Sequence, residues 1–68
     1  MSRYSTRKKI RAHIEYLIAD IERAIKQHMN IEPFFPADQY PFQAEVLLRL
    51  GQGLAVLHDL ALELKKII

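Results

Sequence analysis

Two amphipathic stretches separated by a single break constrain this chain most strongly. Apolar side chains recur at intervals of three and four over residues 6–29, and again over residues 38–66. This spacing places them along one side of an α-helix. The chain has 68 residues and contains no third stretch of this kind. We therefore expect one all-α domain over residues 1–68, an antiparallel helical hairpin of two long, coiled-coil-like amphipathic helices.

The break between the two stretches is the predicted interhelical link, residues 30–40, with the sequence NIEPFFPADQY. Its two prolines cannot lie inside a helix, and they favour extended backbone in the residues before them. Asp38 is the expected N-cap of the second helix, with Pro41 in the first turn. Phe34 and Phe35 are expected to fold back over the end of the hairpin.

Each helix has a predicted seam that faces the other helix. In the first helix this seam consists of Ile10, Ile14, Leu17, Ile21 and Ala24. In the second helix it consists of Leu47, Leu50, Leu54, Leu57, Ala61 and Leu64. A hairpin centred near residue 35 pairs residues whose numbers sum to about 70, so His13 is expected level with His58.

The second helix is also apolar on a second side. This second stripe consists of Ala44, Leu48, Gly51, Ala55 and Leu62. A helix that is apolar on two sides is normally buried on two sides, and the first helix supplies only one cover. Gly51 and Gly53 weaken the helix, which favours either a notch for a closely packed partner helix or a tolerated local kink. The pattern therefore predicts a protein-binding hairpin.

Charge is distributed unevenly along the chain. The first eleven residues carry five bases and no acid, namely Arg3, Arg7, Lys8, Lys9 and Arg11. The net charge of the whole chain is only +2, so the remainder is acidic. One hypothesis is that residues 1–6 form a basic, disordered N-terminus. The alternative is a homodimeric four-helix bundle that binds nucleic acid through these basic residues or acts as a regulatory protein.

Nothing in the sequence indicates catalysis. There is no cysteine, no phosphate-binding glycine loop and no arrangement typical of a nucleophile with its base. His13, His28 and His58 are the only candidates for metal or acid–base chemistry, and a closed zinc site needs four ligands. We expect no enzyme activity, catalytic residue, cofactor, metal or small-molecule substrate. No stretch is long and apolar enough for membrane insertion, and no signal peptide is evident.

The stretch from Asp38 to Lys65 resembles a known family. The similar features are Gln39-Tyr40 before the second helix, the run LGQGLAVLH over residues 50–58, and Leu64-Lys65. These resemble the small E component of the needle-chaperone complex of bacterial type III secretion systems, the YscE/PscE/EscE-like proteins. The likeness covers about the last 40% of the chain. The bulky link departs from the family's pattern.

The resemblance implies a partner and a place. In that family the E component stabilises a helical-repeat chaperone, and the two hold the needle subunit in the bacterial cytoplasm until export. A virulence-associated role in protein transport would follow, with a homodimer possible when the chain is alone. From the second stripe and the similar run together, the expected protein interface consists of Leu48, Leu50, Gly51, Leu54, Ala55, Leu57, His58 and Leu62.

Overall fold

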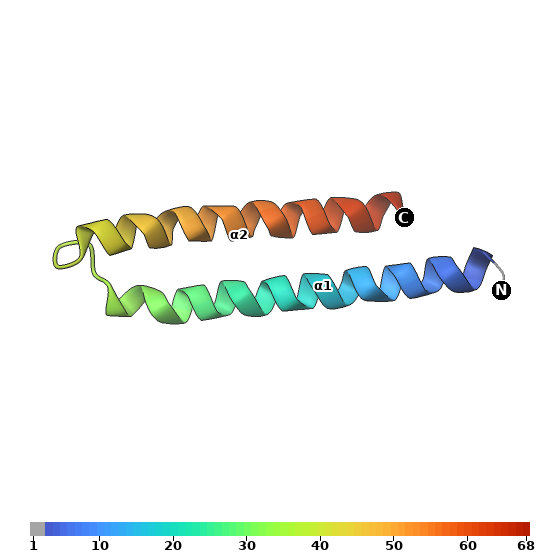
Figure 1. Ribbon diagram of the computed structural model, residues 1–68, viewed down its shortest axis with the longest axis horizontal. Helices are drawn as coiled ribbons and strands as arrows, with labels where there is room; N and C mark the ends of the chain where they lie inside the picture. Colours follow the sequence, from blue (N-terminus) through green and yellow to red (C-terminus); the bar gives the residue numbers. More distant parts are fainter. Residues whose placement is uncertain (1–2) are drawn as a thin grey trace.

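The computed structural model describes residues 3–68, with side chains from Thr6 onward, and these residues form a hairpin of two long helices. Helix α1 spans Arg3–Ile31, a short 3₁₀ helix η1 spans Glu32–Phe34, and α2 spans Pro41–Ile67. The two long helices lie side by side and antiparallel, joined at one end by the link (Figure 1). The prediction of an all-α helical hairpin is confirmed.

Helix α1 is longer than the sequence pattern predicted. It begins at Arg3 rather than Thr6, so the expectation of disorder over residues 1–6 is wrong for residues 3–6. Residues 1–2 lie outside the described part of the chain. At its other end α1 continues through Asn30 to Ile31 and passes directly into η1, where Pro33 occupies the first turn. A proline is tolerated there because first-turn amides have no partner within the helix.

The link ends in a tight turn that starts α2. The backbone amides of Gln39 and Tyr40 donate to the Pro36 carbonyl oxygen at 3.1 and 2.8 Å. The N-cap residue of α2 is Tyr40, which precedes Pro41 and makes no capping hydrogen bond with its side chain. The prediction of Asp38 as N-cap was therefore wrong. These hydrogen bonds shape the turn before α2, and the first hydrogen bond of the helix runs from the Ala44 amide to the Tyr40 carbonyl oxygen at 2.9 Å.

The two phenylalanines of the link behave differently. Phe35 is half-buried and its ring meets the edge of Tyr40, with centroids 5.5 Å apart. Phe34 is 74% exposed, so the expectation that both rings fold back holds only for Phe35.

The contact between α1 and α2 is narrow. Ile14, Ile18 and Ala61 are its only buried hydrophobic residues within the described side chains, and Ile21 and Ile68 pack against them. The inward residues of α2 that are buried or half-buried are Ala44, Leu47, Gly51, Leu54, His58 and Ala61, and Ile68 directly after the helix is also half-buried. The predicted seam of α2 was therefore right at Leu47, Leu54 and Ala61.

The other half of each predicted seam faces solvent. Leu50, Leu57 and Leu64 of α2 are 51, 52 and 40% exposed, and Ile10 and Leu17 of α1 are 44 and 49% exposed. Helical spacing defines the period of an apolar stripe, but two neighbouring rows satisfy it equally well. Both helices are rotated so that the row containing His28 on α1 and the row containing Gly51 on α2 turn inward.

Two polar side-chain contacts between the helices define the register. Glu22 Oε2 lies 3.1 Å from His58 Nε2, and Glu15 Oε1 lies 3.4 Å from Lys65 Nζ. In both pairs the residue numbers sum to 80, rather than the predicted 70. The expectation that His13 lies level with His58 is therefore wrong.

The hairpin exposes more surface than a compact chain of its mass. Its Cα atoms extend over 57 × 17 × 12 Å, and its accessible surface is 5836 Å². A compact protein of 8.0 kDa is expected to expose about 4,400 Å². The difference of roughly 1,400 Å² is surface that two helices lying side by side cannot bury against each other. Neither helix, over the described residues, is long and apolar enough to cross a membrane.

Candidate protein-binding surface

An apolar stripe runs along most of α2 on one flank of the seam that packs against α1. We call it the outer stripe, and its members are Val46, Leu50, Gly53, Leu57, Leu60, Leu64 and Ile67. They follow one another at intervals of 4-3-4-3-4-3, the spacing of a coiled-coil seam. The six members with side chains are between 40 and 76% exposed. The structure therefore presents a complete helix-packing seam that α1 does not cover.

Gly53 makes a notch in the middle of the outer stripe. Apart from its own stretch of helix, a Cβ atom added at Gly53 would meet no heavy atom within 4 Å, so nothing inside the hairpin requires a glycine there. Its cost as a helix-interior glycine is roughly 1 kcal/mol relative to alanine. An open glycine flanked by leucines permits close approach of another helix backbone, which supports the notch hypothesis at Gly53.

Gly51 has a different role, inside the hairpin. A Cβ atom added at Gly51 would lie 2.8 Å from His28 Cε1 and 3.1 Å from His28 Nε2. The absence of a side chain at Gly51 therefore makes room for the His28 ring. The notch hypothesis was wrong for Gly51, because the space there is filled by α1.

His28 joins three parts of the hairpin. Its side chain is 10% exposed; Nε2 donates to the Leu47 carbonyl oxygen of α2 at 2.6 Å, and Nδ1 lies 3.1 Å from Glu32 Oε1 of η1. The ring thus connects the end of α1 to both α2 and the link. Sequence reasoning treated His28 only as a possible metal or acid–base residue. The sequence does contain a signal for this packing, since Gly51 leaves room for a large side chain of the facing helix. Recognising His28 as that side chain requires the correct register between α1 and α2.

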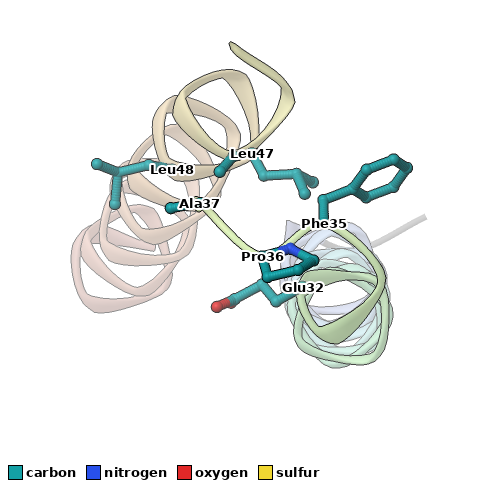
Figure 2. A pocket seen from close by; sticks show the side chains of 7 residues that line it. Glu32, Phe35, Pro36, Ala37, Leu47 and Leu48 are labelled. Atoms are coloured by element: carbon teal, nitrogen blue, oxygen red, sulfur yellow. The ribbon is translucent and has the colours of Figure 1, made fainter. Parts of the chain in front are cut away.

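The opposite flank of α2 is also apolar but shorter. Leu48, Ala55 and Leu62 are exposed there, with Leu48 at 61%. Near the hairpin tip Leu48 borders a pocket of about 360 Å³. Its walls are Glu32, Phe35, Pro36, Ala37, Ala44, Leu47 and Leu48, as the close view shows (Figure 2). The pocket offers an apolar hole with one carboxylate that is already engaged by His28.

The predicted interface residues therefore divide into three groups. Leu50 and Leu57 lie in the outer stripe. Leu48, Ala55 and Leu62 lie on the opposite flank. Gly51, Leu54 and His58 are half-buried between α1 and α2, where they serve the hairpin rather than an outside partner. Val46, Leu60 and Ile67 extend the outer stripe, and sequence reasoning did not assign them because it used the wrong seam.

The histidines are separate from one another. His58 pairs with Glu22, and His13 meets Tyr16 edge-on with ring centroids 6.0 Å apart. Glu22 lies nine positions after His13 along the helix, a rise of about 13.5 Å. Within residues 3–68, no group of three or more histidine or acidic side chains is placed to hold a metal ion.

The N-terminal end of α1 projects beyond the C-terminal end of α2 (Figure 1). Because Glu15 is level with Lys65, the part of α1 before residue 12 lies beyond the level of Ile68 and has no α2 beside it. Arg7, Lys8, Lys9 and Arg11 are exposed in this region, which we call the basic overhang. The acids Glu32, Asp38 and Glu45 lie at the other end of the hairpin.

No protein-family model, no curated protein and no solved structure matches this chain.

Proposed function

We propose that this chain is a non-enzymatic protein-binding subunit whose outer stripe is covered by a helix of another protein. The observation that carries the proposal is the exposed seam from Val46 to Ile67, with its open notch at Gly53. The stripe spans residues 46–67 of α2, a length of about 33 Å, so it offers a partner helix about six turns of contact. Heptad-like spacing is matched best by another helix, not by a strand or a flat surface.

The more specific proposal is a co-chaperone of the type III secretion needle subunit. The resemblance of residues 38–65 to the E component supports it, and the helical-repeat partner of that family supplies helices of the kind that the outer stripe fits. Leu50 and Leu57 belong both to the similar run and to the exposed stripe. On this proposal the chain acts in the bacterial cytoplasm, bound to the chaperone and through it to the needle subunit.

A protein partner fits the surface better than nucleic acid does. The outer stripe contains no charged side chain, whereas nucleic-acid binding depends on lysine and arginine side chains of the protein that contact the phosphates. The bases gather instead on the short basic overhang. The outer stripe is larger than the basic overhang, and packing of a partner helix on α2 would cover it.

Co-expression with a helical-repeat protein, sought among the proteins encoded beside this chain, tests the proposal. We expect a 1:1 complex by native mass measurement. Leu57→Glu and Leu60→Glu should each weaken it at least 100-fold, because a buried unpaired carboxylate is strongly unfavourable. The matched control is Gln52→Glu, an exposed position outside the stripe that should leave the complex intact. A complex that tolerates both leucine substitutions, or failure of the wild-type chain to bind, would contradict the proposal.

A further inference from the structure

We propose that, without another partner, two copies of this chain pair antiparallel through one broad face to form a four-helix bundle. The face is wider than the outer stripe because α1 contributes half of it. This pairing goes beyond the function proposed above and does not depend on it.

The face consists of two apolar rows at intervals of seven residues. The α1 row is Ile10, Leu17, Ala24 and Ile31. The α2 row is Leu50, Leu57 and Leu64. Apart from half-buried Ala24, all of these side chains are 40 to 52% exposed. We call the two rows together the two-helix face.

Helix geometry places both rows on one side of the hairpin. Each row follows an inward residue by three positions, as Leu17 follows Ile14 and Leu57 follows Leu54. In antiparallel helices, equal offsets from the seam lie along the same edge of it. Glu15 and Glu22, which pair with Lys65 and His58, directly follow inward positions and mark the opposite edge. The two-helix face is therefore continuous across α1 and α2 and contains no charged residue in either row.

The two rows share one centre of symmetry. The α1 row is centred between residues 20 and 21, and the α2 row is centred on Leu57. These centres are level in the hairpin, because their numbers sum to about 77. The contacts between α1 and α2 set sums of 75 for His28 with Leu47 and 80 for Glu22 with His58. A single two-fold axis perpendicular to the helices can therefore relate both rows to their copies.

Such an axis gives a self-complementary interface, as a closed homodimer requires. Ile10 of one copy meets Ile31 of the other, and Leu57 meets its own counterpart on the axis. Leu17 meets the smaller Ala24, so a large side chain faces a small one.

Charge favours the antiparallel arrangement. It brings the basic overhang of one copy, with Lys8 and Arg11, over the hairpin tip of the other, with Glu32 and Asp38. A parallel pair would place the two basic overhangs together, where like charges repel.

The area is sufficient for a stable pair. A face about 40 Å long and two helices wide covers roughly 800 Å² per copy, which is the area of a standard protein–protein interface. The hairpin has about 1,400 Å² of surface beyond that of a compact chain, so pairing would remove a large part of it.

Sedimentation equilibrium of the full chain tests the pairing. We expect twice the mass of the 8.0 kDa chain at 100 μM, and a mass of 8.0 kDa for Leu17→Glu. The control Tyr16→Glu, at a neighbouring position that is 65% exposed, should remain dimeric. Leu17 is outside the outer stripe, so Leu17→Glu should still bind the helical-repeat partner, which separates this proposal from the proposed function. A wild-type chain that is folded and monomeric at 100 μM overturns the pairing.

Cross-linking tests the orientation, since the chain has no native cysteine. Leu57→Cys should cross-link to its own counterpart with a short bismaleimide, because Leu57 lies on the proposed axis. Ile10→Cys should not, because its two copies lie at opposite ends of the dimer. Cross-linking of Ile10→Cys without that of Leu57→Cys would overturn the antiparallel arrangement.

Discussion

Gly51→Ala is expected to destabilise the hairpin, whereas Gly53→Ala, two residues away, is expected to stabilise it. Both substitutions gain roughly 1 kcal/mol of helix propensity. At Gly51 the new Cβ would lie 2.8 Å from His28 Cε1, so the ring must move. The ring has little freedom to move, because both of its nitrogens are engaged and its side chain is 10% exposed. Losing these contacts costs about 1–3 kcal/mol each, which exceeds the gain.

Thermal and urea unfolding followed by circular dichroism would measure this pair of substitutions. We expect a net loss of about 1–3 kcal/mol for Gly51→Ala and a gain of up to about 1 kcal/mol for Gly53→Ala. In a His28→Ala background the Gly51→Ala substitution should become stabilising, because the atom it strikes is gone. Equal effects of the two glycine substitutions in the wild-type chain would show that His28 does not pack on Gly51.

Ile18→Ala is expected to remove a large part of the total stability. Ile18 is 8% exposed and is one of three buried hydrophobic residues within the described side chains. Replacing a buried isoleucine by alanine costs about 2–5 kcal/mol. A chain of this length is stable by roughly 3–10 kcal/mol, so the helical signal should fall sharply or its midpoint should shift by many degrees.

The control for Ile18→Ala is Tyr16→Ala on the same helix. Tyr16 is 65% exposed and lies away from the seam, so its loss should change stability by less than about 0.5 kcal/mol. Circular dichroism at a fixed chain concentration measures both variants. Similar melting curves for Ile18→Ala and Tyr16→Ala would mean that the narrow core does not hold the helices together.

Much of the fold could be predicted from helical periodicity and the prolines of the link. The two helices, their antiparallel arrangement and the inward positions Leu47, Leu54 and Ala61 follow from that pattern. The exposure of Leu50 and Leu57 could not be predicted, because α2 is apolar at so many positions that more than one row has the spacing of a seam. The choice between rows depends on how α1 fits, and therefore on His28 and Gly51, which meet only in the folded hairpin.

The register between the two helices also could not be predicted from the apolar periodicity. A centre near residue 35 assumed a symmetrical link, whereas η1 follows α1 without a gap and the turn before Pro41 is tight. This asymmetry moves α2 along α1, so that Glu22 rather than His13 meets His58. The general prediction of surplus apolar surface is sharpened by these corrections, since the surplus includes Val46, Leu60 and Ile67 in addition to Leu50 and Leu57.

Thiol labelling measures whether another protein chain covers the outer stripe, as we propose. Leu60→Cys and Gln52→Cys each introduce the only thiol of the chain, the first inside the stripe and the second outside it. The proposal predicts that, in the complex with the helical-repeat partner, maleimide reacts at least tenfold more slowly with Leu60→Cys than with Gln52→Cys. Equal labelling rates at the two positions in that complex would contradict it.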